Sequence, residues 1–77
     1  MTDNINIGKE IHKELQKQGR SVVWLSRQLG TSRMACYRIF NNYSIDTQVL
    51  YRISSVLGVD FFKAYSESLE KDTLKNV

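Results

Sequence analysis

The feature that most constrains this chain is a stretch of two short helical patterns separated by a glycine, within residues 21–42. The first pattern places apolar or small residues on one helical face, at Val22, Leu25, Ser26 and Leu29. The second pattern places Cys36, Ile39 and Phe40 on one face. Gly30 lies between them, and glycine adopts the positive φ that ends a helix at little cost. We therefore predict two helices joined by a sharp turn, with the second held at a steep angle so that its outer face projects.

The residues around these patterns supply helix caps and an unusual outer face. Ser21 and Ser32 stand at the expected N-caps, where a serine hydroxyl can accept a backbone N–H of the first turn. The outer stripe of the second helix is Met34, Tyr37, Arg38 and Asn41, with Arg33 in its first turn. A solvated face usually carries charged or short polar groups, whereas these side chains can contact base edges, methyl groups and phosphates.

The charge distribution coincides with this stretch. The net charge is only +3, but the segment from Leu15 to Ile45 contains no acidic residue. Its basic residues are Lys17, Arg20, Arg27, Arg33 and Arg38. A positive segment without acids is expected for a protein that meets a phosphate backbone.

Further helical patterns flank the stretch on both sides. Residues 7–18 place Ile7, Ile11 and Leu15 on one face, and Gly19 is expected to end that helix. Asp46 is expected to cap a helix that ends at Gly58. The inward face of that helix is Leu50, Ile53, Ser54 and Leu57. Asp60 is expected to cap a last helix with an apolar stripe at Phe61, Phe62, Tyr65 and Leu69.

These patterns together predict an all-α fold of five helices in a single compact domain. The domain spans residues 1–77, with an ordered core at about 6–69 and fraying tails at 1–5 and 70–77. A chain of this length has room for one domain and for no second site.

The central stretch also matches a known pattern of apolar, small and glycine positions, at Leu25, Ser26, Leu29, Gly30, Cys36 and Ile39. It resembles the helix-turn-helix of the lambda-repressor-like family, also called the XRE or Cro/C1 type. With the flanking helices, the resemblance covers about residues 6–65. One departure is Val22, which stands where the family often has a phosphate-binding Gln. Another is Ser26, whose hydroxyl needs a partner and can bond back to an upstream carbonyl.

The resemblance implies a bacterial or phage-type transcriptional regulator that binds double-stranded DNA sequence-specifically, with residues 32–41 in the major groove. Arg33 is expected to read a guanine through two hydrogen bonds, and Met34 and Tyr37 to contact thymine methyls or sugars. The expected phosphate contacts are Lys17, Arg20, Ser21, Arg38, Asn41, Asn42 and Tyr43. Asn41 and Asn42 also have a structural interpretation, because asparagine tolerates the left-handed conformation that ends a helix.

The last helix leaves a second function open. A domain this small cannot easily bury the whole stripe of Phe61, Phe62, Tyr65 and Leu69. The stripe therefore either closes the core or forms an exposed patch through which the chain makes a homodimer. The competing interpretation is a protein-interaction module, antitoxin-like or phage-type, that docks a partner on this helix.

Other classes of function find no support in the sequence. No catalytic constellation, metal-ligand spacing or phosphate-binding glycine loop is present, so we expect neither an enzyme nor a cofactor. No apolar run is long enough to span a bilayer and no signal pattern opens the chain, so we expect a cytoplasmic protein that does not contact a membrane.

Three isolated residues receive structural interpretations. Cys36 is expected to be a small buried hydrophobe, because it lies on an apolar helix face. His12 is expected to be solvated, on the side of its helix away from Ile7 and Ile11. Trp24 is expected either to pack at the rim of the core or to donate its indole N–H to a phosphate.

Overall fold

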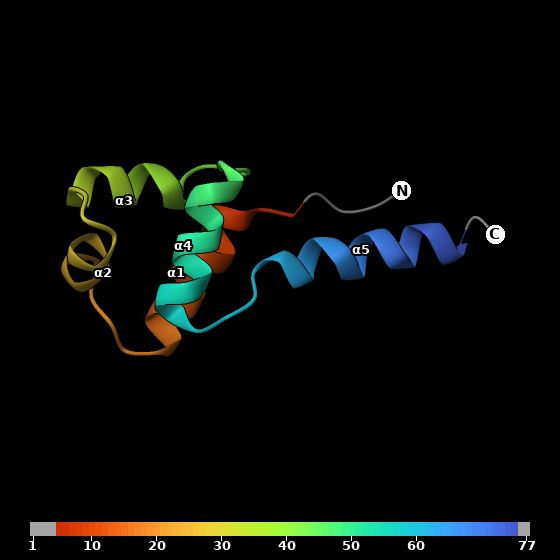
Figure 1. The fold of residues 1–77 in the computed structure, drawn as a ribbon, viewed down its shortest axis with the longest axis horizontal. Coiled ribbons are helices and arrows are strands. Elements are labelled where there is room, and N and C mark those ends of the chain that lie inside the picture. Colours follow the sequence, from red (N-terminus) through yellow and green to blue (C-terminus); the bar gives the residue numbers. More distant parts are fainter. Residues whose placement is uncertain (1–4, 76–77) are drawn as a thin grey trace.

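A computed structural model describes residues 5–75 of the chain, and within them it contains five helices and no strand (Figure 1). The helices are α1 (Ile7–Lys17), α2 (Val22–Leu29), α3 (Arg33–Phe40), α4 (Thr47–Leu57) and α5 (Phe62–Lys75). The predicted all-α fold of five helices is confirmed. No helix in the described part of the chain has the length and apolar character needed to cross a membrane.

Side-chain caps begin these helices where the sequence predicted them. Ser21 Oγ accepts from Trp24 N at 3.0 Å and Ser32 Oγ accepts from Ala35 N at 3.1 Å. Carboxylates cap the later helices, with Asp46 Oδ1 accepting from Gln48 N at 2.7 Å and Asp60 Oδ1 from Phe62 N at 3.0 Å. A further cap was not predicted: Asn6 Oδ1 accepts from Lys9 N at 3.1 Å, so Asn6 is the N-cap of α1.

Helices α1 to α4 form one body around a shared core. The buried apolar residues are Ile7, Ile11, Leu15, Leu25, Leu29, Cys36, Phe40, Leu50, Ile53, Leu57 and Phe61. These come from the helix faces that the sequence predicted to point inward. Gly30 has a φ of 68°, which turns the chain from α2 into α3. The helices therefore pack α2 against α3 and α4, and α1 against α3 and α4.

The start of α1 lies directly against the end of α3. Ile7 N donates to Tyr43 O and Gly8 N donates to Asn42 O, both at 3.0 Å. These are first-turn amides that have no partner within their own helix. A Cβ at Gly8 would collide with three backbone carbonyl oxygens at the end of α3 and just beyond it. Glycine at this position thus permits the close approach that ties α1 to α3.

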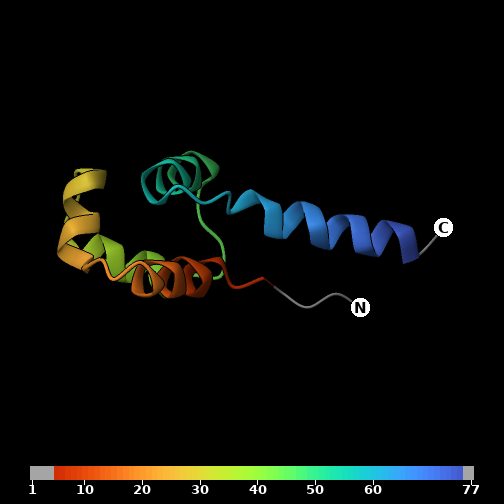
Figure 2. The same cartoon turned by 90° about the horizontal axis from the view of Figure 1, so that it is seen from below.

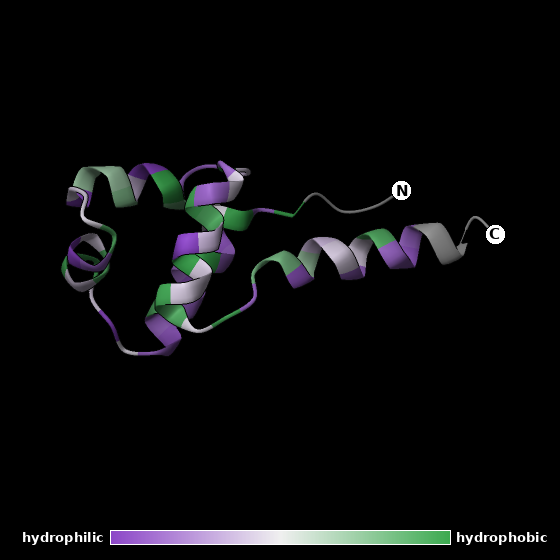
Figure 3. Cartoon of the chain, in the orientation of Figure 1, coloured by the Kyte–Doolittle hydropathy of each residue, from purple (hydrophilic) through white to green (hydrophobic). Residues whose placement is uncertain are grey.

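Helix α5 leads away from the body, as both views show (Figure 1, Figure 2). Phe61, just before α5, is buried with 6% of its surface exposed, and Phe62 is half-buried against the core. Further along, Tyr65 is 36% exposed and Leu69 is 67% exposed. The hydropathy colouring accordingly shows apolar residues at the start of α5 and again midway along it (Figure 3).

The stripe predicted for this last helix is therefore divided. Phe61 closes the core, so its candidate role as an exposed dimer contact is corrected. Tyr65 and Leu69 form the exposed part. Helix α5 also continues to Lys75, beyond the predicted limit of the ordered core, while the predicted tails lie partly outside the described residues.

The structure tests the predictions for the three isolated residues, Cys36, Trp24 and His12, and for Ser26, one of the departures from the family pattern. Cys36 is fully buried, and Ser26 Oγ donates back to Val23 O at 2.7 Å, as predicted. Trp24 packs at the rim of the core, as the first of its two interpretations predicted. The prediction for His12 is wrong: its ring is half-buried and stacks on Phe40, with centroids 4.3 Å apart and planes 9° apart. Periodicity within α1 cannot reveal an aromatic partner on α3.

Candidate nucleic-acid interface

The outer face of α3 is open along its length. Met34 is 69% exposed and Tyr37 is 48% exposed, while Arg33 and Arg38 are also exposed. On the opposite face Cys36 and Phe40 are buried. The structure therefore brings the three predicted base-contacting residues together on a surface of α3 that no other element covers. This surface, formed by Arg33, Met34, Tyr37, Arg38 and Asn41, is called the α3 outer face below.

An arginine from α4 helps to hold α2 against the body. Arg52 Nη2 donates to Leu29 O at 2.9 Å, across 23 positions in the chain. Leu29 is the last residue of α2, where backbone carbonyls lack partners within the helix. A charge-assisted hydrogen bond at this point stabilises the turn that aims α3. The sequence carries no signal for this contact, because a side chain that reaches another helix leaves no local pattern.

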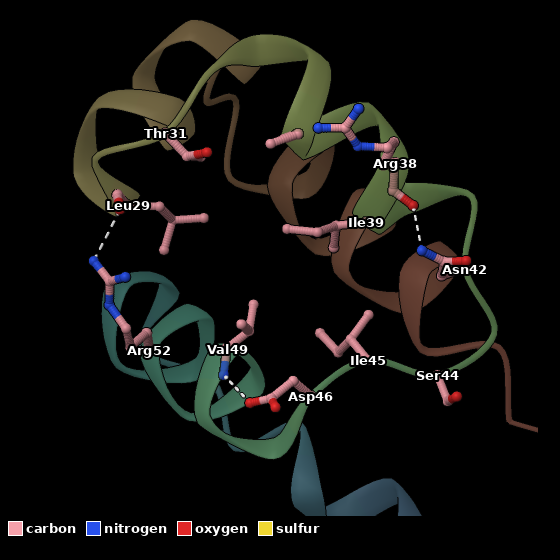
Figure 4. A pocket seen from close by; sticks show the side chains of 11 residues that line it. Leu29, Thr31, Arg38, Ile39, Asn42, Ser44, Ile45, Asp46, Val49 and Arg52 are labelled. Atoms are coloured by element: carbon pink, nitrogen blue, oxygen red, sulfur yellow. Dashed lines mark hydrogen bonds between the residues drawn. The ribbon is translucent and has the colours of Figure 1, made fainter.

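A groove of about 540 Å³ lies between α3 and α4 (Figure 4). Its floor is apolar, with Ile39, Ile45 and Val49 half-buried and Leu29 buried. Arg38, an exposed residue of the α3 outer face, borders it from α3. One flank of α3 therefore presents a cation beside this groove.

The loop after α3 does not contain the left-handed residue that the structural interpretation of Asn41 and Asn42 predicted. Asn41 has a φ of −91°, and no non-glycine residue among those described has a positive φ. The left-handed helix end predicted for Asn41 and Asn42 is therefore wrong. Instead, Asn42 Nδ2 donates to Arg38 O at 2.9 Å, which caps the last turn through a side chain. Asn41 and Tyr43 remain exposed and can donate to a ligand.

A second cationic region lies at the start of α2. The Arg20 guanidinium stacks over the Trp24 ring at 4.0 Å, and Arg20 Nε donates to Gln18 Oε1 at 3.3 Å. Lys17, the last residue of α1, is also exposed. Val22, at the position where a phosphate-binding Gln was expected, is half-buried against the core. The Arg20 guanidinium, held in place by Trp24, can therefore supply at this helix start the anion contact that a Gln at position 22 was expected to make.

The thiol of Cys36 lies on the buried face of α3. Burial raises the pKa of this thiol, which favours its protonated form. Within residues 5–75 no three His, Cys, Asp or Glu side chains gather where they could hold a metal. What the arrangement can do is contact a polyanion through its arginines, amides and hydroxyls, and contact apolar base groups through Met34 and Tyr37.

Comparison with known proteins identifies a family model that matches most of the chain. The family model described as helix-turn-helix, of the XRE or lambda-repressor-like type, matches residues 11–63, from within α1 to the start of α5. The members of this family are DNA-binding regulators. No curated protein and no solved structure matches the chain.

Proposed function

Because this chain belongs to the XRE or lambda-repressor-like helix-turn-helix family of DNA-binding regulators, we propose that it binds specific double-stranded DNA sites with α3 in the major groove. The observation that carries the proposal is the division of α3 into a buried face and a fully open one. A helix in the major groove needs such a free face, with donors and apolar groups at base height.

The residues of the α3 outer face divide between bases and backbone. Arg33, in the first turn, suits two hydrogen bonds to the O6 and N7 atoms of a guanine. Met34 and Tyr37 can pack on thymine methyls or on sugars. Arg38 lies in the last turn and borders the groove between α3 and α4, so a phosphate is its proposed partner.

The proposed phosphate contacts lie on both sides of α3. They are Lys17, Arg20, Ser21, Arg38, Asn41, Asn42 and Tyr43. Ser21 Oγ accepts the capping hydrogen bond and still has a proton to donate. Regulation would follow from occupancy of the site, as expected for a bacterial or phage-type transcriptional regulator, by blocking or recruiting the polymerase.

The test is a fluorescence-anisotropy titration against mixed-sequence duplex DNA over a series of salt concentrations, followed by selection of the preferred site. Log affinity should fall linearly with log salt concentration, because phosphate contacts release counterions. Arg33→Ala should weaken binding to the selected site by about 1–3 kcal/mol. Arg27→Ala is the matched control, since Arg27 is an equally charged and exposed residue on α2 outside the α3 outer face.

Two results would contradict this function. One is the lack of any salt-dependent binding at low ionic strength. The other is an equal, small effect of Arg33→Ala and Arg27→Ala, which would mean that only net charge matters and that α3 does not read bases.

For α5 we propose that its exposed residues, Tyr65 and Leu69, pair with the same residues of a second copy. The two lie four positions apart on the same helix face, away from the body, so a twofold axis can bring each against its counterpart. Two α3 helices related in this way should be about 34 Å apart on a near-palindromic site. Sedimentation analysis should show a dimer that Leu69→Glu dissociates. A wild-type monomer at all concentrations would instead favour the docking of a different protein on α5.

A further inference from the structure

A second opening, of about 300 Å³, lies on the other flank of α3, between α3 and the N-terminal half of α1. We call it the α1–α3 crevice. Its lining residues are Asn6, Lys9, His12, Tyr37, Phe40 and Asn41. Tyr37 and Asn41 also belong to the α3 outer face, so the crevice is continuous with the surface proposed to enter the major groove.

An aromatic layer fixes the position of His12 in this crevice. Its ring stacks on Phe40, and Phe40 in turn meets Tyr37 edge-on, with centroids 6.1 Å apart. Stacking covers a ring face and leaves the two nitrogen atoms at the ring edge. Neither nitrogen of His12 makes a hydrogen bond within the described part of the chain. The imidazole is thus held in one plane with its polar edge unused.

The charge of the crevice favours an anion. Its titratable groups are Lys9, His12 and Tyr37, and no carboxylate among residues 5–75 lines it. The Lys9 ammonium is exposed and makes no ion pair within that part of the chain. The side-chain amide of Asn41 is likewise unpaired there, so it can donate beside the lysine.

The dimensions of DNA bring phosphates to both flanks of a helix that lies in the major groove. An α-helix with its side chains is about 10–12 Å across and the major groove is about 12 Å wide, so the groove walls run along both flanks of an inserted helix. On the α4 flank, Arg38 and Asn42 border the groove between α3 and α4 and can meet one wall. On the α1 flank, the α1–α3 crevice opens beside the α3 outer face and can meet the opposite wall.

We infer that the α1–α3 crevice binds a backbone phosphate of the DNA, with Lys9, Asn41 and His12 as its contacts; this inference rests on the proposed DNA-binding function. His12, which the sequence assigned to solvent, and Lys9 become part of the interface. An imidazole always carries at least one ring N–H, so His12 can donate a hydrogen bond to a phosphate oxygen. Removing this donor should therefore weaken DNA binding.

The experiment measures the DNA affinity of the wild-type protein and of two His12 variants at one pH and one salt concentration. His12→Phe keeps an aromatic ring to stack on Phe40 but has no N–H to donate. It should bind DNA roughly three- to tenfold more weakly than the wild type, the range of a partly screened hydrogen bond to a charged group. His12→Lys supplies a donor again and should bind at least as tightly as the wild type.

A salt series tests Lys9 independently of His12. Lys9→Met should reduce the magnitude of the salt slope by about 0.9, the loss of one phosphate contact. Lys13→Met is the matched control, because Lys13 is an exposed lysine of the same helix that does not line the crevice. Circular dichroism should show that each variant is folded.

The outcomes separate this inference from the function on which it rests. If Arg33→Ala weakens DNA binding but His12→Phe binds like the wild type and Lys9→Met behaves like Lys13→Met, the crevice inference is wrong and DNA binding stands. If the wild-type protein does not bind DNA, both are wrong. If His12→Phe weakens binding and the salt slope falls only in Lys9→Met, the crevice is a phosphate site.

Discussion

Helices α2 and α3 begin in the same way but differ in how much of each is buried, and therefore in their roles. Each has eight residues, and each starts at a serine N-cap with nearly equal backbone angles, φ −88° and ψ 160° at Ser21 and φ −85° and ψ 161° at Ser32. In α2, three residues are buried and Arg52 from α4 holds the last carbonyl. In α3, two residues are buried and the opposite face is open along its length.

The difference shows that local sequence makes a helix but neighbouring helices decide what it does. Helix α2 is packed against α3 and α4. Helix α3 is packed against α1 and α2, which leaves its other side free. Stability should therefore depend mainly on the inner residues of both helices, and the reading of DNA bases on the outer residues of α3.

The largest expected effect comes from removing a core residue of α2. Leu25 is fully buried, so Leu25→Ala should lower the free energy of unfolding by about 2–5 kcal/mol, because it deletes packing and leaves a cavity. Met34→Ala, on the open face of α3, should change that free energy by less than about 0.5 kcal/mol. Urea denaturation measures both. A similar loss in the two variants would show that the outer face of α3 also carries stability.

The two serine caps test the similarity of the helix starts. Ser21→Ala and Ser32→Ala should each cost about 1 kcal/mol of stability, because each leaves one first-turn amide without its partner. Since the cap geometries agree, the two costs should agree within a few tenths of a kcal/mol. Thermal and urea denaturation give the comparison. Unequal costs would mean that tertiary contacts replace one of the caps.

Cys36, on the inner face of α3, should make the free energy of unfolding fall at alkaline pH. Burial raises the pKa of the Cys36 thiol, so the unfolded chain loses this proton at a lower pH than the folded chain. The contribution to stability is complete below the ordinary cysteine pKa, and it is lost as the pH rises through the raised folded value. Urea denaturation at pH values across this range should show a decline. Cys36→Ala should flatten it, while the part that persists reflects other groups such as Tyr65, whose pKa is also raised by burial.

The smallest effect on stability is expected for Ser26→Ala, a substitution on the inner face of α2. Ser26→Ala removes a hydroxyl that bonds only to a carbonyl one turn earlier, and it leaves no new cavity larger than that oxygen. Stability should change by less than about 0.5 kcal/mol. A loss well above 1 kcal/mol in the free energy of unfolding would show that the hydroxyl has a further partner in solution.

Much of the fold could be predicted from the sequence, because its signals are local. Ser21, Ser32, Asp46 and Asp60 each lie just before a periodic apolar pattern, and each accepts the backbone N–H expected of it. The turn at Gly30 follows in the same way from a glycine placed directly after the last periodic residue. The placement of Arg33, Met34 and Tyr37 on an open face follows from helical spacing once the inner face is known.

The contacts between helices could not be predicted. Gln18 Nε2 donates to Leu57 O at 2.9 Å, and Arg52 reaches Leu29, although the partners are 39 and 23 positions apart. The stack of His12 on Phe40 is of the same kind, and periodicity within α1 predicted the opposite. Such contacts depend on the distance and angle between helices, which a pattern within one helix does not encode.

The sequence by itself determined the helices, most of their caps, their inward faces and the family, because each depends on residues a few positions apart. Only the tertiary structure decided that Phe61 closes the core while Leu69 is exposed, and that α1 and α3 together form the α1–α3 crevice. The physical reason is that burial and neighbourhood are properties of packed surfaces. They exist only once helices distant in the chain have come together.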